Sequence, residues 1–295
     1  NNVLNVFVYD EPRYEEHRKM SIFEIDKNFD SDSTTCKVSW PCYDVYEMQC
    51  VAINNSYLYC LNVNRSGTEF SVCTSVDPKS KSILKIPPRV NNKTLTPFDT
   101  CEMKDSIIVY LKKETSNCFY LYNKELDEWF PLPQMKVEQK LACVTACKST
   151  NLLYKIGGEF RNSVEAYDYC AGKWHELPQS IVKRSCGACC SYKGNVYVTG
   201  GIDTPSCEIF DPVAGRWKEF EPLNSDIAWH RMIPYANSLW TVGGKRNCIY
   251  NRYIDKYDLK SNKWCLSGIL EKKIRRPGYA PTFRVFDAVV FKPHL

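Results

Sequence analysis

Short hydrophobic runs separated by turn residues dominate the chain, and they are clearest between residues 187 and 222. Four runs follow one another there: GACCSY, NVYVTGG, SCEIFDP and RWKEFEP. Lys-Gly, Asp-Thr-Pro and Val-Ala-Gly divide them. Such runs, rich in Val, Cys and aromatic residues and bounded by Gly and Pro, are typical of β-strands. Only 133–147 offers a long amphipathic helix, and it fits a loop that enters a strand equally well.

The same pattern returns along the chain at a nearly constant interval. Glycine pairs stand at 157–158, 200–201 and 243–244, which are 43 residues apart. The aromatic–Asp pairs that follow them are Tyr167-Asp168, Phe210-Asp211 and Tyr257-Asp258. Seven residues past each aromatic stands a tryptophan: Trp174, Trp217 and Trp264. Weaker copies are anchored at Trp40, Leu84 and Trp129, so six units of about 45 residues fill the chain.

Four strands per unit at this period predict the blades of a β-propeller. The glycine pairs are expected at the end of each second strand, where backbones crowd and a side chain would clash. We expect the aromatic and the tryptophan to pack between adjacent blades. The aspartate is expected to accept hydrogen bonds from turn amides between strands three and four. The repeat itself is therefore scaffold.

The double Gly, the Tyr–Asp pair and the later Trp together resemble the kelch repeat. The resemblance is strong in 143–264, fair in 101–135 and weak in 1–90. It implies an all-β fold: a six-bladed kelch propeller with four-stranded antiparallel blades in one domain, 1–295. The tail FRVFDAVVFK, at 283–292, is expected to complete blade one and close the ring. The blades are then expected at 1–45 plus 283–292, 46–90, 91–135, 136–180, 181–224 and 225–270.

Composition narrows the setting of the protein. The net charge of +5 suits a partner with acidic spots, but it is too small for a nucleic-acid binder. No apolar run approaches 18 residues, so we expect no membrane contact. Sixteen Cys without a compact framework favour free thiols in a reducing compartment, cytoplasmic or also nuclear, although three glycosylation sequons point weakly the other way. The start NNVLNVFVYDEP, without Met, indicates a domain from a longer protein.

Residues for catalysis or metal binding do not assemble into a motif. The group Cys186, Cys189 and Cys190 resembles half of a zinc site, but the favoured interpretation is an inner strand. No nucleophile elbow and no phosphate-binding glycine loop occurs. His230, beside Trp229, is interpreted as a recognition contact rather than a catalytic base. We therefore expect a protein that is not an enzyme, with no catalytic residue, cofactor or metal.

Loops after the second strands and loops between blades are expected to share one face of the propeller. Arg and aromatic residues there suit an acidic or phosphorylated peptide, because these types dominate binding hot spots. Some of them are expected to be solvated or to brace a neighbouring blade. The predicted substrate-binding residues are Arg13, Tyr14, Arg65, Lys113, Arg161, Arg184, Trp229, His230, Arg231, Arg246, Arg276 and Tyr279, with Lys183 and Arg275 nearby.

Similarity to the kelch domains of BTB–Kelch adaptors implies a function for this face. It would capture a short degron of a substrate protein, while BTB and BACK domains absent from this chain recruit a cullin-3 RING ubiquitin ligase. The full-length protein would then dimerise through its BTB domain, with this domain monomeric. The alternative is a structural kelch protein that binds actin, and a BTB domain upstream would separate the two. A propeller enzyme is the third class, which metal analysis would test.

Overall fold

A computed structural model describes the backbone of 25 strands. Outside the strands it describes the turns and linkers within residues 117–136, 139–247 and 249–270. Side chains are described for residues 100–103, 106–110, 118–136, 139–247 and 249–270. Every regular element in the described residues is a β-strand, so the all-β prediction is confirmed and the helix at 133–147 is not formed. No helix long and apolar enough to cross a membrane occurs in the part searched, which is the described residues.

The strands pair into antiparallel sheets of four, with one short addition. The first three sheets contain β25 (Phe283–Phe291) with β1 (Val3–Asp10), β2 (Lys19–Ile25) and β3 (Thr35–Pro41); β4 (Glu47–Ile53), β5 (Tyr57–Asn64), β6 (Gly67–Thr74) and β7 (Lys81–Leu84); and β8 (Thr96–Met103), β9 (Ser106–Lys112), β10 (Asn117–Asn123) and β11 (Glu128–Pro131).

The later sheets contain β12 (Cys143–Cys147), β13 (Leu152–Gly158), β14 (Arg161–Asp168) and β15 (Lys173–Leu177); β16 (Ala188–Tyr192), β17 (Asn195–Thr199), β18 (Cys207–Asp211) and β19 (Arg216–Phe220); and β20 (Ala228–Tyr235), β21 (Ser238–Arg246), β23 (Tyr253–Asp258) and β24 (Lys263–Ile269), with β22 (Ile249–Tyr250) paired to β21. The predicted four-stranded antiparallel sheets are thus confirmed. The blade count, the blade boundaries and the closure of the ring stay predictions.

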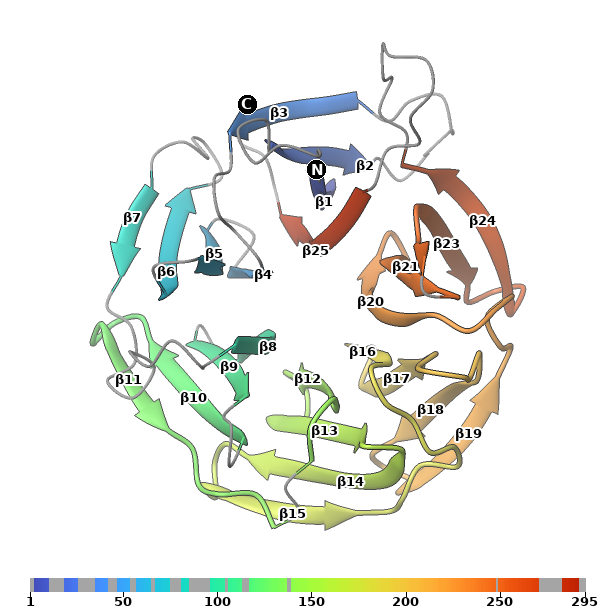
Figure 1. Cartoon of the computed structure of the whole chain (residues 1–295). Helices are drawn as coiled ribbons and strands as arrows, with labels where there is room; N and C mark the ends of the chain where they lie inside the picture. Colours follow the sequence, from blue (N-terminus) through green and yellow to red (C-terminus); the bar gives the residue numbers. More distant parts are fainter. Residues whose placement is uncertain are drawn as a thin grey trace.

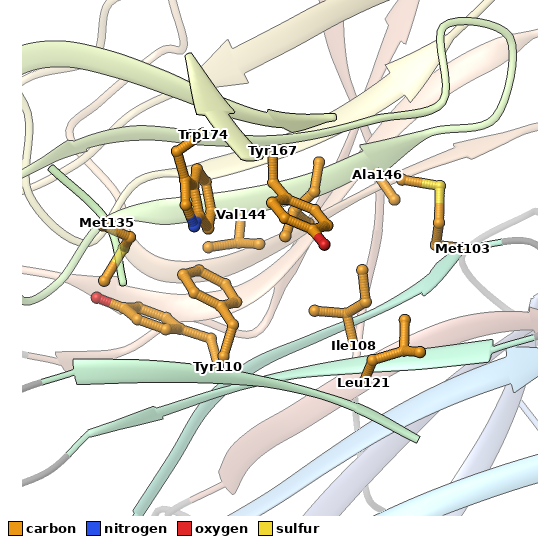
Figure 2. Close-up of a cluster of buried hydrophobic side chains, with 11 residues drawn as sticks. Met103, Ile108, Tyr110, Leu121, Met135, Val144, Ala146, Tyr167 and Trp174 are labelled. Atoms are coloured by element: carbon orange, nitrogen blue, oxygen red, sulfur yellow. The ribbon is translucent and has the colours of Figure 1, made fainter. Parts of the chain in front are cut away.

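The sheets are arranged around a common centre (Figure 1). In the later sheets β12, β16 and β20 lie innermost, and β15, β19 and β24 lie on the outside. The innermost strands of neighbouring sheets contact one another. The hydrophobic core lies between sheets, as Figure 2 shows for the cluster that joins Tyr110 and Leu121 of one sheet to Val144 and Trp174 of the next. Each sheet therefore depends on its neighbours for burial.

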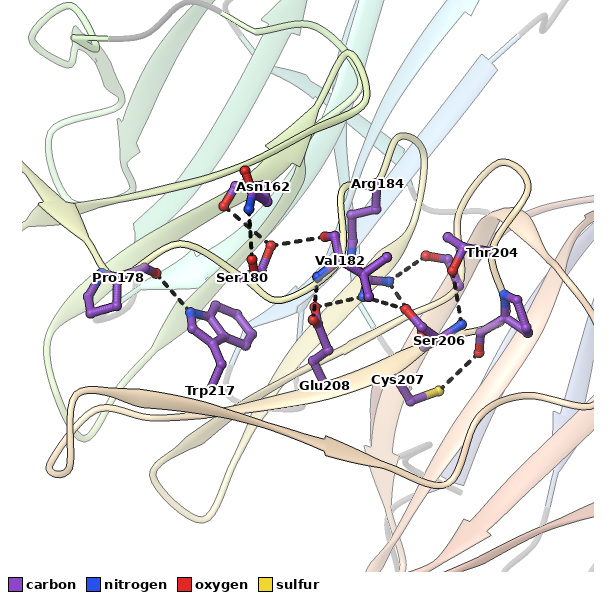
Figure 3. Close-up of polar contacts among 12 residues, drawn as sticks. Asn162, Pro178, Ser180, Val182, Arg184, Thr204, Ser206, Cys207, Glu208 and Trp217 are labelled. Carbon is purple, nitrogen blue, oxygen red and sulfur yellow. Dashed lines mark hydrogen bonds and ion pairs between the residues drawn. The ribbon is translucent and has the colours of Figure 1, made fainter.

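The recurrent tryptophans connect each of the three later sheets to the preceding one, as predicted. Trp174 Nε1 donates a hydrogen bond to the carbonyl oxygen of Pro133 at 2.8 Å, and its ring centre lies 5.2 Å from that of Phe119. Trp217 and Trp264 make equivalent bonds to the carbonyls of Pro178 and Glu221, both at 2.8 Å (Figure 3 shows the first). The indole thus supplies both buried area and a partner for a linker carbonyl.

The recurrent aspartates close the turn between the third and fourth strands, which confirms their predicted role. Asp168 Oδ1 accepts hydrogen bonds from the backbone N–H groups of Cys170 at 2.8 Å and Ala171 at 3.0 Å. Asp211 repeats this arrangement, and so does Asn123 in the weaker unit. The N–H of Ala171, followed by that of Cys170, lowers the pKa of Asp168 because these bonds favour the carboxylate.

The glycine pairs lie where the second strand meets the linker into the next sheet. A Cβ built on Gly200 would lie 2.5 Å from the carbonyl oxygen of Ile227, and one on Gly157 would lie 2.8 Å from that of Arg184. The predicted crowding is therefore confirmed, and the crowding group is linker backbone. The pair at 243–244 departs from the prediction because β21 continues through it to Arg246.

We predict that Gly200→Ala destabilises the fold more than Gly215→Ala. Both glycines have positive φ, +59° and +61°, so each substitution forces a left-handed alanine at about 1–2 kcal/mol. Only Gly200 is crowded, and overpacking there adds about 1–3 kcal/mol. Urea unfolding of the two variants measures the difference. Equal losses would show that the linker moves away without cost.

Candidate functional site

Loops after second strands and linkers between sheets are hydrogen-bonded to one another, so the prediction that they share a face is confirmed for the later sheets. The N–H of Gly158 donates to the carbonyl of Arg184 at 2.9 Å, and the N–H of Arg184 donates to that of Arg161 at 3.1 Å. In the next sheet the N–H of Gly201 donates to the carbonyl of Ile227 at 2.8 Å. Backbone bonds therefore fix the surface that these segments form.

Leu141, Cys186 and Trp229 occupy equivalent positions at or just before the start of the innermost strands β12, β16 and β20. Backbone hydrogen bonds between them link one sheet to the next. The N–H of Cys186 donates to the carbonyl of Leu141 at 2.9 Å, and the N–H of Trp229 donates to that of Cys186 at 2.7 Å. All three residues have left-handed φ values, of +66°, +57° and +57° along the chain. Bulky residues rarely adopt this conformation. Because it recurs, the fold rather than the side chain sets the backbone here.

Buried ion pairs help to hold the linkers between sheets in place. Lys155 Nζ and Glu165 Oε2 are 2.9 Å apart, and Arg184 and Glu208 are joined at 2.7 Å. Both pairs are fully enclosed. The second carboxylate oxygen of Glu208 accepts the backbone N–H of Val182 at 2.7 Å, and that of Glu165 accepts the N–H of Lys136 at 3.0 Å. Each acid therefore fastens a linker to the third strand.

Sequence reasoning missed these acids, although a signal for them exists. Glu165, Glu208 and Asp255 each stand three residues before the turn aspartate of their unit. Asp255 forms the third ion pair, with Arg246. Burial raises the pKa of Asp255, and the charge of Arg246 acts in the opposite direction. An acid at a fixed offset inside a hydrophobic strand is a pattern that could have been read.

Arg184 is a correction to the predicted site. It was expected to face a partner, but its side chain is completely buried. Figure 3 shows its guanidinium within a network, where it donates to Ser206 Oγ at 3.0 Å and to Glu208. It also donates to the carbonyl of Gly200. Arg184 therefore holds the loop after β17 against its linker and presents no charge to solvent.

His230 is a second correction. Together with Trp229 and Arg231 it belongs to strand β20 rather than to a loop. Only 4% of His230 is exposed, and Thr199 Oγ1 lies 2.9 Å from its Nε2 atom. Burial, aided by the positive charges of Arg184 and Arg246, lowers the pKa of His230 to about 3. The imidazole is neutral and unavailable as a recognition contact.

The remaining predicted residues divide into three groups. Arg161, Lys183 and Trp229 are exposed on the face. Arg231 and Arg246 are half-buried, and Arg246 is committed to Asp255 and to the ring of Tyr253. The other predicted residues lie outside the described residues: Arg13, Tyr14, Arg65, Lys113, Arg275, Arg276 and Tyr279.

Exposed apolar residues that were not predicted join this face. Phe160, Ile181 and Ile249 are all more than half exposed, as is Trp229. Phe160 lies in the turn after β13, and its N–H is bound by Ser185 Oγ of the linker at 2.7 Å. Their positions in the loop segments were the available signal. A preference for Arg and aromatic types explains why Ile181 and Ile249 were missed, but Phe160 fitted that preference and was passed over.

The predicted inner strand explains the cysteine group. Cys189 and Cys190 lie on β16, and Cys190 packs in the core between two sheets. Burial raises the pKa of Cys190 above its usual range and that of Cys186 to about 12, so both are inert thiols. None of the ten cysteines whose side chains are described is paired in a disulfide. Within those residues, no group of three or more His, Cys, Asp or Glu could hold a metal ion.

Known proteins resemble the chain in motif and in fold. Residues 140–180 and 183–224, which contain β12–β15 and β16–β19, match the family model of the Kelch motif. A solved structure titled "Structure of YjhT" superposes with a TM-score of 0.63 at 12% identity, over 89% of this chain and 97% of that one. No curated protein sequence matches. These findings support a kelch-repeat domain. Kelch repeats suggest a protein-binding propeller, and the structural likeness concerns the fold alone.

We predict that Glu208→Gln costs about 3–5 kcal/mol of folding free energy, because it leaves the buried charge of Arg184 without its partner. The matched control is Glu176→Gln, which breaks an exposed pair with Lys136 and costs about 1 kcal/mol or less. Chemical denaturation of both variants tests this. A small loss for Glu208→Gln would mean that Arg184 is not held by charge.

A second prediction concerns pH. The folded state keeps His230 neutral down to about pH 3, whereas an unfolded histidine binds a proton near pH 6.5. The unfolded state therefore binds more protons in this window, and stability falls as pH drops below 6.5, by about 1.4 kcal/mol per pH unit. In His230→Gln, the unfolding free energy measured between pH 6.5 and 4.5 should depend less steeply on pH, because the contribution of this histidine is absent. An unchanged slope would contradict the assignment.

Proposed function

We propose that this chain is a closed six-bladed kelch propeller that captures a short peptide of a substrate protein on its loop face. The antiparallel pairing of β25 with β1, from Val3 opposite Phe291 to Asp10 opposite Phe283, supports closure by the C-terminal strand. The arrangement of the sheets around one centre supports the count of six blades (Figure 1). Closure matters for binding because it makes the loop face a single rigid surface.

The observation that carries the proposal is that five of the nine large hydrophobic residues exposed among the described residues lie on the loop face. Five large hydrophobic residues are exposed in or beside the loops and linkers of three neighbouring sheets: Phe160, Ile181, Trp229, Ile249 and Tyr253. Backbone bonds and buried ion pairs hold the segments that carry them. Exposed apolar residues on a rigid frame, beside the cations Arg161 and Lys183, have the composition of a protein-binding site.

The wider role that we propose is that of a substrate-recognition module in a BTB–Kelch adaptor for a cullin-3 RING ubiquitin ligase, in the cytoplasm and the nucleus. The Kelch motifs support the kelch part of this proposal. The BTB and BACK domains would belong to the full-length protein and would make it a homodimer. No catalytic step, cofactor or metal is assigned to this chain.

We predict that the double variant Trp229→Ala/Arg161→Ala captures at least tenfold less of the partner proteins that bind the 295-residue chain in a cell extract. Both side chains are exposed, so the melting temperature should not change. The matched control is Val213→Ala, which removes a 98% exposed side chain from the turn between β18 and β19. Quantitative mass spectrometry of the captured proteins measures the effect, and equal capture by all forms would reject this face.

The ligase role is tested with the same double variant in the full-length protein. Cullin-3 should coprecipitate equally with wild type and variant, while only wild type should increase ubiquitination of the captured partners. Absence of cullin-3, with actin among the partners, would instead favour the structural kelch protein. Either result leaves the binding face itself judged by the first measurement.

A further inference from the structure

Lys245, on strand β21, is held between two aromatic rings and was not among the predicted site residues. Its Nζ atom lies 5.7 Å from the ring centre of Trp229 and 4.9 Å from that of Tyr250. Among the described residues no carboxylate pairs with it. The next residue, Arg246, behaves differently because it is paired with Asp255. Two neighbouring cations thus have opposite roles, one neutralised and one with its charge still available.

The rings position the ammonium group without cancelling its charge. A cation over an exposed ring gains about 0.5–1 kcal/mol, which orders a flexible lysine at the rim. Trp229 is itself held by its backbone bond to Cys186, and Ala228 pairs with Lys245 in the strand register. The cation is therefore prepositioned before a partner binds, which lowers the ordering cost of binding.

Apolar surface adjoins this cation. Trp229 is 51% exposed and Ile249, opposite Arg246 in the hairpin of β21 and β22, is 72% exposed. Among the described residues of 245–253, the charged side chains are all positive: Lys245, Arg246 and Arg252. Among the described residues, the acid bound to them is Asp255, which is buried and paired with Arg246. A partner at this corner meets positive charge beside an apolar shelf.

We infer that the corner formed by Trp229, Lys245, Ile249 and Tyr250 binds a peptide segment in which an acidic side chain adjoins an apolar one. The carboxylate accepts a hydrogen bond from Lys245 Nζ, and the apolar side chain packs on the indole of Trp229 and on Ile249. Like charge excludes Lys and Arg from the acidic position. This inference rests on the proposed function and identifies Lys245 as the residue that selects an acidic side chain in the bound peptide.

The test is selection of a displayed library of random decapeptides on the 295-residue chain. Wild type should enrich peptides with Asp or Glu next to a large apolar residue. Lys245→Glu should reverse the preference and enrich Lys or Arg in place of the acid. Lys218→Glu, the same change at an exposed cation on the outer strand β19, outside the loops and linkers of the binding face, should leave the acidic preference unchanged. Melting temperatures of both variants check that they fold.

One enriched peptide then gives the size of the effect. Its Kd, measured by fluorescence polarisation, should rise about tenfold or more with Lys245→Gln, because a hydrogen bond to a charged group is lost. Enrichment of neutral or basic peptides by wild type overturns the inference and leaves the proposed peptide face standing. No enrichment at all overturns both. An acidic preference that survives Lys245→Glu overturns the inference and assigns charge reading to another cation.

Discussion

A buried carboxylate on the third strand of each later sheet is the interaction on which the loop face depends. Glu165 and Glu208 each bind a cation and also accept a backbone N–H from the linker that enters their sheet. A buried charge that lacks its partner costs several kcal/mol. Strand, linker and cation must therefore assemble together. The exposed surface is shaped by groups that no partner can reach.

The parts of the fold that could be predicted from sequence are those whose partners are local or repeated. Asp168 accepts bonds from amides two and three residues away, and the tryptophans of the three later units each donate to a carbonyl at an equivalent place. Arg184 and Lys183 show where such reading fails. They are neighbours in the linker that leads to β16, one buried and one exposed, and the groups that enclose Arg184 lie far along the chain, at Gly200, Ser206 and Glu208.

The alternation of side chains along a strand explains why the position of the site could be predicted from the sequence, whereas its exposed side chains could not. Trp229 and His230 were expected together on a loop, yet on β20 they face opposite sides, one toward solvent and one toward Thr199. Lys245 and Arg246 on β21 divide in the same way. A strand alternates its two faces, so the residue type alone does not tell which neighbour is displayed.

The left-handed position shared by Leu141, Cys186 and Trp229 has a consequence for the surface of the protein. An aliphatic, a thiol and an indole side chain occupy it with nearly the same backbone, because hydrogen bonds from adjacent sheets impose the conformation. The position therefore accepts side chains of different types on nearly the same backbone. Cys186 is buried at this position, whereas Trp229 is 51% exposed, so a substitution at Trp229 changes what the surface presents while the backbone beneath it keeps its hydrogen bonds.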